Sequence, residues 1–342
     1  MSAPKGFLLW IRGITMLKHY IRIIRWIFIT LLLVHPVTLA QSEDATAIVR
    51  VSHALGKTEI PSEPKRIITL GWSGEDVVLA LGTVPIAMTR YGSFPSGMFP
   101  WDEAKLDGET PLLLSGDLNY EAIAALNPDL ILGIYSGIDA VAYKRLSAIA
   151  PTVVYRSGPW QADWREQTKI IGEALGKPKE AKTLITKTEA LLEEFGKEHP
   201  ELQGKTFTFG SYIPGSSGII VYLPSDPRVQ ALTKMGLKVS SGVEALATLD
   251  PDETSTSVSL ENIGSIDADI LIMWYGEGAR SAAEAQPLFA ALDAVKRGSY
   301  VALDDPVSVW STSALSVLSI PYGFPKFVPR LADAARKAEQ HP

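Results

Sequence analysis

The stretch ALNPDLILGIYSG, residues 125–137, has a counterpart in the second half of the chain, SIDADILIMWYG at residues 265–276. In each copy a turn leads from a helical pattern into a short apolar run that predicts a buried strand. A supersecondary unit that is repeated in this way predicts two lobes of one architecture. Two similar units of separate origin are the alternative interpretation.

The two copies stay in register when Asp129 is aligned on Asp269. Upstream of these aspartates, Glu121 then corresponds to Glu261, and each lies near the start of its predicted helix. The repeat therefore includes the helix as well as the strand.

Strand-like and helix-like segments alternate on both sides of the repeat. Residues 66–70 predict a short buried strand, and the apolar positions after it predict a helix that Gly82 ends. Asn119 is a predicted N-cap, and Asp226 followed by Pro227 predicts another helix start. This alternation predicts α/β lobes with parallel sheets and right-handed crossovers.

A long helical pattern separates the two predicted lobes. Residues 161–203 contain no strand-like run, and Gly176-Lys177-Pro178 divides them. We therefore expect residues 41–160 to form the first lobe, residues 161–203 a helical linker, and residues 204–342 the second lobe with closing helices. The predicted fold class is α/β, with two lobes joined by one long helix.

The first 40 residues have the order of an export signal. Basic residues precede an apolar run at residues 26–34, and Ala40 ends the segment with a small side chain. We expect cleavage near Ala40 and a periplasmic protein, with Met1 or Met16 as the start. An uncleaved membrane anchor is the alternative, but the uncharged stretch falls short of the roughly 20 residues that a span needs.

Composition limits the possible functions. The chain has 342 residues, a formal net charge of −6 and no basic run beyond its N-terminal segment, which argues against nucleic acid as a partner. It has no cysteine, so thiolate metal sites and a lipid-modified cysteine are excluded. Its histidines are scattered, and no G-x-S-x-G, G-x-G-x-x-G or Walker motif occurs. We therefore expect a binding protein rather than an enzyme.

Aromatic residues gather at the ends of the predicted strands. In an open α/β sheet ligands bind beyond the carboxyl ends of the strands, and aromatic side chains there enclose a bulky, partly apolar ligand. Guanidinium groups near the same ends suit an anionic ligand; they belong to Arg90, Arg156, Arg228 and Arg280. For any one of these residues, core packing or a solvated surface charge is the alternative.

Acidic residues lie in the first turns of two predicted helices. Glu75 and Asp76 start the first, and Glu261 lies at the start of the helix in the second copy of the repeat. A favourable interaction with the helix dipole is one interpretation. The other is a two-point electrostatic docking surface for a partner, with one acid in each lobe.

Five segments resemble the substrate-binding proteins of ABC importers for iron-siderophores and vitamin B12. They are PKRIITLGWSGEDVVLALG, NPDLILGIYSG, LSAIAPTVVY, WREQTKIIGEALGK and VSLENIGSIDADILI, and the resemblance spans residues 49–335. It implies a class III periplasmic binding protein, with two Rossmann-like lobes and limited hinge motion about one helix. It also implies one glutamate per lobe that docks onto the permease, a role expected for Glu261 and for either Glu75 or Asp76.

The resemblance implies a monomeric protein that binds a ferric siderophore between its lobes and delivers it to an ABC permease. Iron is then chelated by the siderophore, and no cofactor or protein metal ligand is required. The expected ligand contacts are Trp72, Arg90, Tyr91, Trp101, Tyr135, Arg156, Trp160, Tyr212, Tyr222, Trp274 and Tyr275.

The ligand's chemical class stays open at this point. Several hydroxamate binders of this class carry an arginine just before the segment that here begins at Leu118, where this chain has Ser115, Gly116 and Asp117. The absence of that arginine weakens a hydroxamate assignment and says nothing about catecholates or carboxylates, for which other arginines can serve. Cobalamin or haem in the same fold is the first alternative, and a periplasmic hydrolase that acts on the iron complex is a more distant one.

Overall fold

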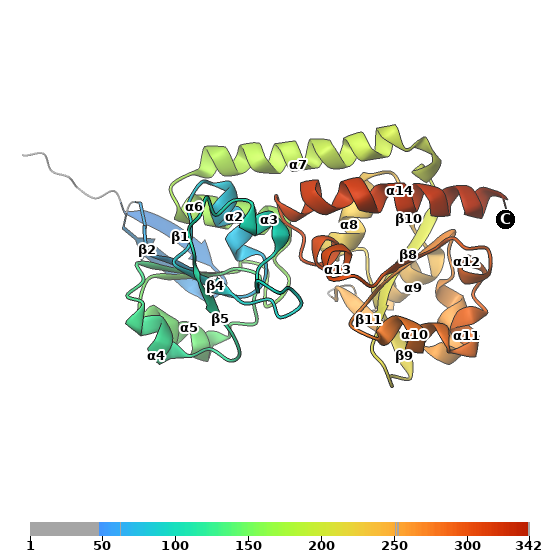
Figure 1. Ribbon diagram of the computed structural model, residues 1–342, viewed down its shortest axis with the longest axis horizontal. Coiled ribbons are helices and arrows are strands. Elements are labelled where there is room, and N and C mark those ends of the chain that lie inside the picture. The colour runs from blue at the N-terminus through green and yellow to red at the C-terminus, as the bar shows by residue number, and fades with distance from the viewer. Residues whose placement is uncertain (1–47, 62, 250, 252, 341–342) are drawn as a thin grey trace, which may run out of the picture. The chain divides into compact units, whose positions relative to one another are not determined.

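The computed structural model describes residues 48–61, 63–249, 251 and 253–340 (Figure 1). The predicted export signal, residues 1–40, lies outside these residues. The chain from Thr46 to Pro342 forms one compact unit with two separate large sheets. The predicted α/β fold with two lobes joined by a helix is confirmed.

The first lobe contains a five-stranded sheet in which all the neighbouring strands are parallel. Its strand order is β5-β4-β3-β6-β7. Every residue of three of these strands, β3, β6 and β7, is buried, as expected for a parallel sheet with both faces covered. The strands are β3 (Ile67–Thr69), β4 (Ala87–Thr89), β5 (Leu112–Leu114), β6 (Leu130–Gly133) and β7 (Thr152–Val154).

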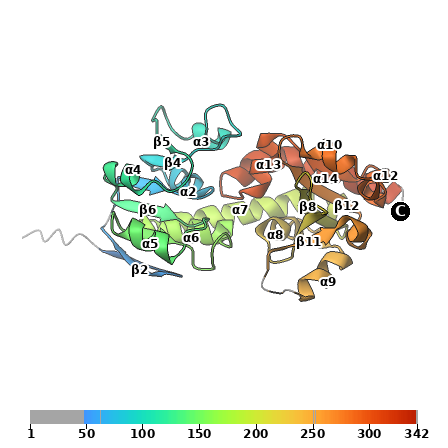
Figure 2. The same ribbon diagram turned by 90° about the horizontal axis from the view of Figure 1, so that it is seen from below.

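Helices and one hairpin surround this sheet (Figure 2). The predicted N-cap Asn119 is confirmed, because its side chain accepts a hydrogen bond from the backbone of Ala122 at 3.0 Å. The hairpin consists of β1 (Val49–His53) and β2 (Gly56–Ile60). The helices are α2 (Gly74–Ala80), α3 (Pro100–Glu103), α4 (Tyr120–Ala125), α5 (Ala140–Ser147) and α6 (Trp164–Ala174).

The second lobe contains a mixed sheet rather than the parallel sheet that we expected. Its order is β11-β9-β8-β12-β13, with β10 paired to β8, and β9 runs antiparallel to both of its neighbours. Only residues 213–217 connect β8 to β9, and a parallel crossover needs a dozen residues or more, so the connection must be a hairpin. The strands are β8 (Thr206–Tyr212), β9 (Gly218–Tyr222), β10 (Lys238–Val239), β11 (Ser255–Ser259), β12 (Ile270–Tyr275) and β13 (Tyr300–Leu303).

Short helices cover this second sheet, and a long one closes the chain. The predicted start at Asp226 is confirmed, since its carboxylate accepts a hydrogen bond from the backbone of Arg228 at 2.8 Å. The helices are α8 (Pro227–Lys234), α9 (Ser241–Leu249), α10 (Ala279–Glu284), α11 (Pro287–Ala290), α12 (Asp293–Lys296), α13 (Pro306–Ser313) and α14 (Ser319–Gln340), with the 3-10 helices η1 (Pro200–Leu202) and η2 (Leu260–Ile266).

One helix, α7 (Pro178–Glu198), runs from the first lobe to the second (Figure 1). It contacts α6 at one end and α8, α14 and η1 at the other. The expected linker of residues 161–203 is therefore divided, because α6 also packs on α2 and β1 and so belongs to the first lobe. At 21 residues α7 is about 32 Å long.

The repeated sequence has the same structural task in each lobe. Asp129 precedes β6 and accepts hydrogen bonds from the backbone of Lys65 and Arg66, which lead into β3. Asp269 precedes β12 and accepts two hydrogen bonds from Thr206, the first residue of β8. Each repeat thus joins a central strand to its neighbour in the sheet.

Candidate functional site

A cavity of about 650 Å³ opens at the carboxyl ends of the strands of the first sheet. Its walls come from the loops after β3, β4, β5 and β6, together with Trp160. Chain connections from β3 run outward in one direction through β4 and β5, and in the other through β6 and β7. The cavity therefore lies at the topological switch point, where open α/β sheets bind their ligands.

Aromatic side chains line this cavity and extend beyond it. The ring centre of Trp72 lies 5.3 Å from that of Trp160, 6.1 Å from that of Tyr135 and 5.0 Å from that of Trp310. Trp72 and Trp160 line the cavity itself, whereas Trp310 comes from α13 of the second lobe. The predicted contacts Trp72, Tyr135 and Trp160 are thus brought together, and we call them, with Trp310, the aromatic cluster.

The loops that carry this cluster approach each other closely. The backbone N–H of Trp72 donates to the carbonyl of Tyr135 at 2.9 Å. Gly71 has φ 89°, and a Cβ there would lie 2.3 Å from the same carbonyl oxygen, so only glycine fits. The ends of β3 and β6 are therefore fixed as one unit.

Trp160 has an unusual backbone conformation for an aromatic residue. Its φ is 59°, in the left-handed region, and its N–H donates to the carbonyl of Ser136 at 3.1 Å. Gly137 leaves room for the indole, since a Cβ there would lie 2.7 Å from Nε1. The residue is 45% exposed, and strained backbone of this kind is enriched at functional sites.

The four candidate arginines differ in their surroundings. Arg90 lines the cavity, and within the described part of the chain its guanidinium has no ion pair. Arg280 pairs with Glu284 and Asp304. Arg156 does not face the cavity, contrary to our expectation. Its guanidinium binds Glu173 of α6 and the carbonyl of Ser52 in β1, so it holds the hairpin to the lobe.

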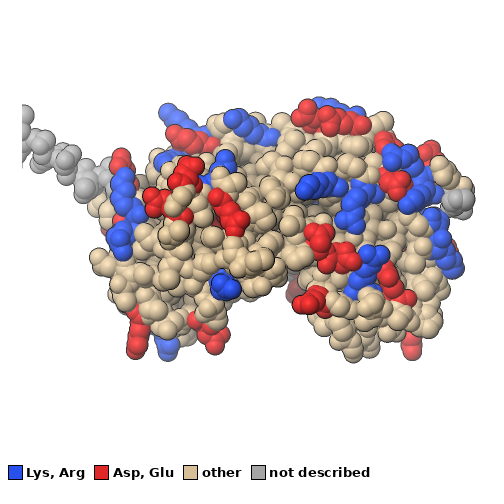
Figure 3. Space-filling view, in the orientation of Figure 1, with Lys and Arg blue, Asp and Glu red and all other residues tan. Residues whose placement is uncertain are grey.

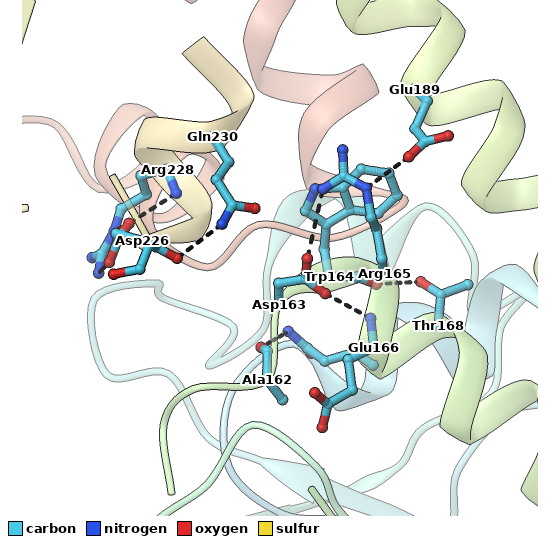
Figure 4. Close-up of polar contacts among 12 residues, drawn as sticks. Ala162, Asp163, Trp164, Arg165, Glu166, Thr168, Glu189, Asp226, Arg228 and Gln230 are labelled. Carbon is cyan, nitrogen blue, oxygen red and sulfur yellow. Dashed lines mark hydrogen bonds and ion pairs between the residues drawn. The ribbon is translucent and has the colours of Figure 1, made fainter. Parts of the chain in front are cut away.

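Arg228 belongs to a compact unit in the second lobe. Its guanidinium forms two hydrogen bonds with Asp226, at 2.7 and 2.6 Å (Figure 4). It also lies over the ring of Tyr222, 3.6 Å from the centroid, and the hydroxyl of Tyr222 accepts from Trp274 at 2.7 Å. The predicted contacts Tyr222 and Trp274 thus stand beside an arginine whose charge is already compensated.

Tyr135 links this unit to the first lobe. Tyr135 and Arg228 line the same narrow gap, together with residues of both lobes. Burial raises the pKa of the Tyr135 hydroxyl, and the positive charge of Arg228 opposes that effect. The two lobes therefore interact electrostatically beside the aromatic cluster.

Six predicted ligand contacts are buried: Tyr222 and Tyr135 are 5% and 9% exposed, and four others are less exposed still. Tyr91 is 3% exposed and stacks on Phe99 at 3.8 Å, and Trp101, equally buried, stacks on the other side of Phe99. In the second lobe Tyr212 is 4% and Tyr275 2% exposed. These four side chains pack in the core and offer no surface to a ligand in this structure.

The expected docking role of Glu75 and Asp76 is wrong for this structure. Both side chains are 0% exposed, and a carboxylate without surface cannot contact a second protein. Tyr91 donates to Glu75 at 2.5 Å, and Trp101 donates to Asp76 at 2.7 Å. Asp76 also accepts a hydrogen bond from Ser316 of the second lobe, so it joins the lobes rather than a partner.

Asp102 completes a group of three buried carboxyls with these two residues. One oxygen from each lies within 4.8 Å of the others, and both oxygens of Asp102 lack a hydrogen-bond partner within the described residues. Burial, with the charge of Asp76, raises the pKa of Glu75 to about 8, and burial raises that of Asp76 to about 7. These shifts favour the protonated forms, so the group carries fewer than three negative charges at neutral pH.

Two other acidic residues, Glu261 and Glu121, are exposed, unlike these three buried carboxyls. Glu261 lies on the surface at the start of η2, as the docking prediction requires. Glu121, its counterpart in the sequence repeat, is also exposed, in the first turn of α4. Glu121, rather than Glu75 or Asp76, is therefore the exposed first-lobe acid at the repeat position that corresponds to Glu261.

Trp310 is the aromatic contact that sequence reasoning missed. It follows β13, the last strand, and its ring lies 5.0 Å from that of Trp72. The rule that located the other aromatics, a position beyond a strand end, applies to Trp310 as well.

Comparison with known proteins identifies the family. Residues 67–307 match the periplasmic binding protein family, and the chain belongs to it. This is a family of binding proteins rather than enzymes. Within the described residues, no helix has both the length and the apolar character needed to cross a membrane.

Individual relatives agree with this assignment. The probable siderophore-binding lipoprotein YfiY of Bacillus subtilis (strain 168) is 30% identical over 275 residues, 77% of this chain and 82% of the relative. The iron-uptake substrate-binding protein PiaA of Streptococcus pneumoniae TIGR4, solved in complex with ferrichrome, is 32% identical with a TM-score of 0.76, over 84% of this chain and 99% of PiaA. A periplasmic solute-binding protein of Mycobacterium smegmatis str. MC2 155 is 32% identical with a TM-score of 0.75, again over 84% and 99%.

Proposed function

We propose that this protein binds a ferric siderophore in the cavity of the first lobe, against the aromatic cluster. The cluster is the observation that carries the proposal. A siderophore surrounds its iron with an organic shell, and aromatic faces at a switch point suit such a bulky, partly apolar ligand. The printed descriptions of YfiY and of the PiaA complex support the same class of ligand.

In this proposal the siderophore supplies every ligand of the iron. Among the described residues, the one group of three side chains able to hold a metal ion is the buried set Glu75, Asp76 and Asp102. None of the three lines the cavity. The protein then recognises the surface of the complex and needs no cofactor.

We further propose that the protein delivers its ligand, as a monomer, to an ABC permease outside the cytoplasm. Two relatives are described by name as lipoproteins, one of them siderophore-binding and the other the substrate-binding protein of an ABC transporter. Both descriptions support a location outside the cytoplasm. Residues 1–40 carry the predicted export signal. N-terminal sequencing of the exported protein tests this: a mature chain that begins near Gln41 supports it, and one that retains the apolar run contradicts it.

Docking onto the permease is assigned here to Glu121 and Glu261. The two side chains are exposed, carry the same charge, and occupy equivalent positions of a repeat that builds both lobes. One carboxylate on each lobe gives a partner two points of electrostatic contact.

Titration of the mature protein's tryptophan fluorescence tests the proposed ligand class. Ferric hydroxamate, catecholate and carboxylate complexes are added in parallel with cyanocobalamin and haemin. Trp72, Trp160 and Trp310 report directly on the site, so we expect saturable quenching by a ferric siderophore. Saturation by cyanocobalamin or haemin alone would overturn the proposal, and chemical breakdown of the recovered ligand would favour the hydrolase.

A pair of glycine variants tests whether the ligand that quenches the fluorescence binds in the cavity. Gly137→Ala places a methyl group 2.7 Å from the indole nitrogen of Trp160, so the ring must move, and we expect at least about a tenfold loss of affinity. Gly92→Ala is the matched control, because its methyl group would meet nothing within 4 Å. Equal affinities for the two variants would place the ligand elsewhere.

A further inference from the structure

The charges around the cavity are few and nearly balanced. Its charged lining residues are Arg90, Asp117 and Asp139, one cation and two carboxylates. Asp139 also caps α5, accepting from the backbone of Ala142 at 2.7 Å, whereas Asp117 is exposed. The lining therefore has a formal charge of about −1 at neutral pH.

In the described part of the second lobe, the arginine beside Tyr135 is already paired with a carboxylate. The side chain of Arg228 is 12% exposed, and its guanidinium is held by two hydrogen bonds to Asp226, whose side chain is 2% exposed. Such a bidentate pair is neutral as a unit. The side chains that surround it, Tyr135, Tyr222 and Trp274, carry no charge.

The outer surface beside the notch between the lobes also lacks a concentration of basic residues on the visible face (Figure 3). On the face shown in the space-filling view, charged side chains of both signs are spread over both lobes, and the notch between the lobes has a basic side chain on its left flank and acidic side chains on its right, with uncharged surface between them (Figure 3). Attraction of a multiply charged anion needs a concentration of basic residues, which that part of the visible face does not have.

Ferric siderophores differ widely in net charge. Three singly charged hydroxamates balance the ferric ion, so their complex is neutral, and an added ammonium group makes it cationic. Three doubly charged catecholates leave an excess of three negative charges, and ferric citrate complexes are anionic as well. Enclosure of such an anion would require compensating cations, because a desolvated charge without a partner is costly.

From this charge balance we infer that the site takes an uncharged or cationic ferric trihydroxamate and discriminates against anionic catecholate and citrate complexes. The inference rests on the proposed function and names the ligand class of the same site. Arg90 then donates hydrogen bonds to the hydroxamate oxygens, in place of the arginine that is absent at residues 115–117. Asp117 supplies negative charge at the rim of the cavity and disfavours anions.

Four probes of defined charge test this inference. Ferrichrome is neutral, ferrioxamine B carries an extra ammonium group, and a ferric tris-catecholate and ferric dicitrate are anionic. Dissociation constants are measured by fluorescence quenching at ionic strengths from about 0.05 to 0.5 M. We expect a trihydroxamate to bind at least about tenfold more tightly than either anion, with ferrichrome affinity nearly independent of salt.

Charge variants distinguish an effect of the charge in the cavity from an effect of the protein's net charge. Asp117→Lys should strengthen tris-catecholate binding by about tenfold, so that the preference for ferrichrome over the tris-catecholate falls by about the same factor. Glu194→Lys on α7 makes the same change in net charge at an exposed position outside the cavity, and should alter neither affinity.

The outcomes distinguish the two proposals. Tighter binding of the tris-catecholate or of ferric dicitrate than of both trihydroxamates overturns the inference and leaves the siderophore function standing. An equal response of Asp117→Lys and Glu194→Lys also overturns it. Binding of cyanocobalamin or haemin with no response to any ferric siderophore overturns the proposed function and the inference together.

Discussion

The carboxyl of Asp102 has unusual surroundings for an acidic side chain. It is fully buried beside two other carboxyls, and neither of its oxygens has a hydrogen-bond partner within the described residues. Burial raises its pKa well above the ordinary value, and the charges of Asp76 and Glu75 raise it further. A shared proton between neighbouring carboxyls is the simplest way to relieve their repulsion.

This group makes stability depend on pH. The folded pKa values of Glu75 and Asp76 are about 8 and about 7, whereas free carboxyls titrate near 4. Between these limits the folded state keeps protons that the unfolded chain releases. The free energy of unfolding contributed by this group is therefore complete below about pH 4 and falls as the pH rises to about 8.

We predict that Asp102→Asn raises the melting temperature, and raises it more at pH 8 than at pH 5. The amide removes one ionisable group and donates a hydrogen bond to a neighbouring carboxylate. Thermal unfolding at both pH values is the measurement. Glu103→Gln, the exposed neighbour, is the matched control and should show no such pH dependence. An equal shift at the two pH values would contradict this account.

At the scale of elements, the repeated aspartates connect strands through side-chain hydrogen bonds. Asp269 accepts from the backbone N–H and the hydroxyl of Thr206, at 2.8 and 2.9 Å. We predict that Asp269→Ala lowers the free energy of unfolding by about 2 kcal/mol, because both donors lose a charged acceptor.

Urea denaturation measures this effect, and Asp269→Asn is the conservative comparison. The asparagine keeps one carbonyl acceptor, so it should lose clearly less stability than the alanine variant. If both variants are as stable as the original protein, the repeated aspartate does not support the strand junction.

Much of the architecture could be predicted because it depends on local signals. The strand before Gly71, the cap at Asn119 and the break at Gly176 follow from short-range preferences that the structure obeys. The antiparallel β9 could not be predicted from its composition, since an apolar run has no direction. Its orientation follows from the short connection at residues 213–217.

The site was predicted less completely than the fold, because a position beyond a strand end does not determine which way a side chain points. Trp72 and Trp160 face the cavity. Tyr91 and Trp101 follow the same rule in sequence, yet Phe99 lies between them and draws both rings into a stack. That stack depends on contacts along a loop that has no periodic pattern.

At the scale of the whole protein, the proposed docking residues lie outside the proposed ligand cavity. We predict that replacing Glu121 and Glu261 together with alanine abolishes import and changes siderophore affinity by no more than about threefold, because neither residue lines the cavity. Uptake of labelled ferric siderophore by cells and binding to the purified protein are measured side by side.

The control for this experiment is the pair Glu194→Ala and Glu198→Ala, two exposed acids on α7 that remove the same total charge. Unimpaired import with the Glu121 and Glu261 double variant would refute the docking assignment. A large loss of affinity in that variant would show that these residues belong to the ligand site.

The connection of the lobes by α7, with the hydrogen bond from Ser316 to Asp76, has a kinetic consequence for import. If Glu121 and Glu261 dock onto the permease as proposed, lobes that are fixed in this way present them in the same arrangement whether the cavity is empty or filled. Empty protein then acts as a competitive inhibitor of loaded protein. The import rate depends on the fraction of binding protein that carries ligand, and overproduction of the protein under siderophore scarcity slows uptake instead of raising it.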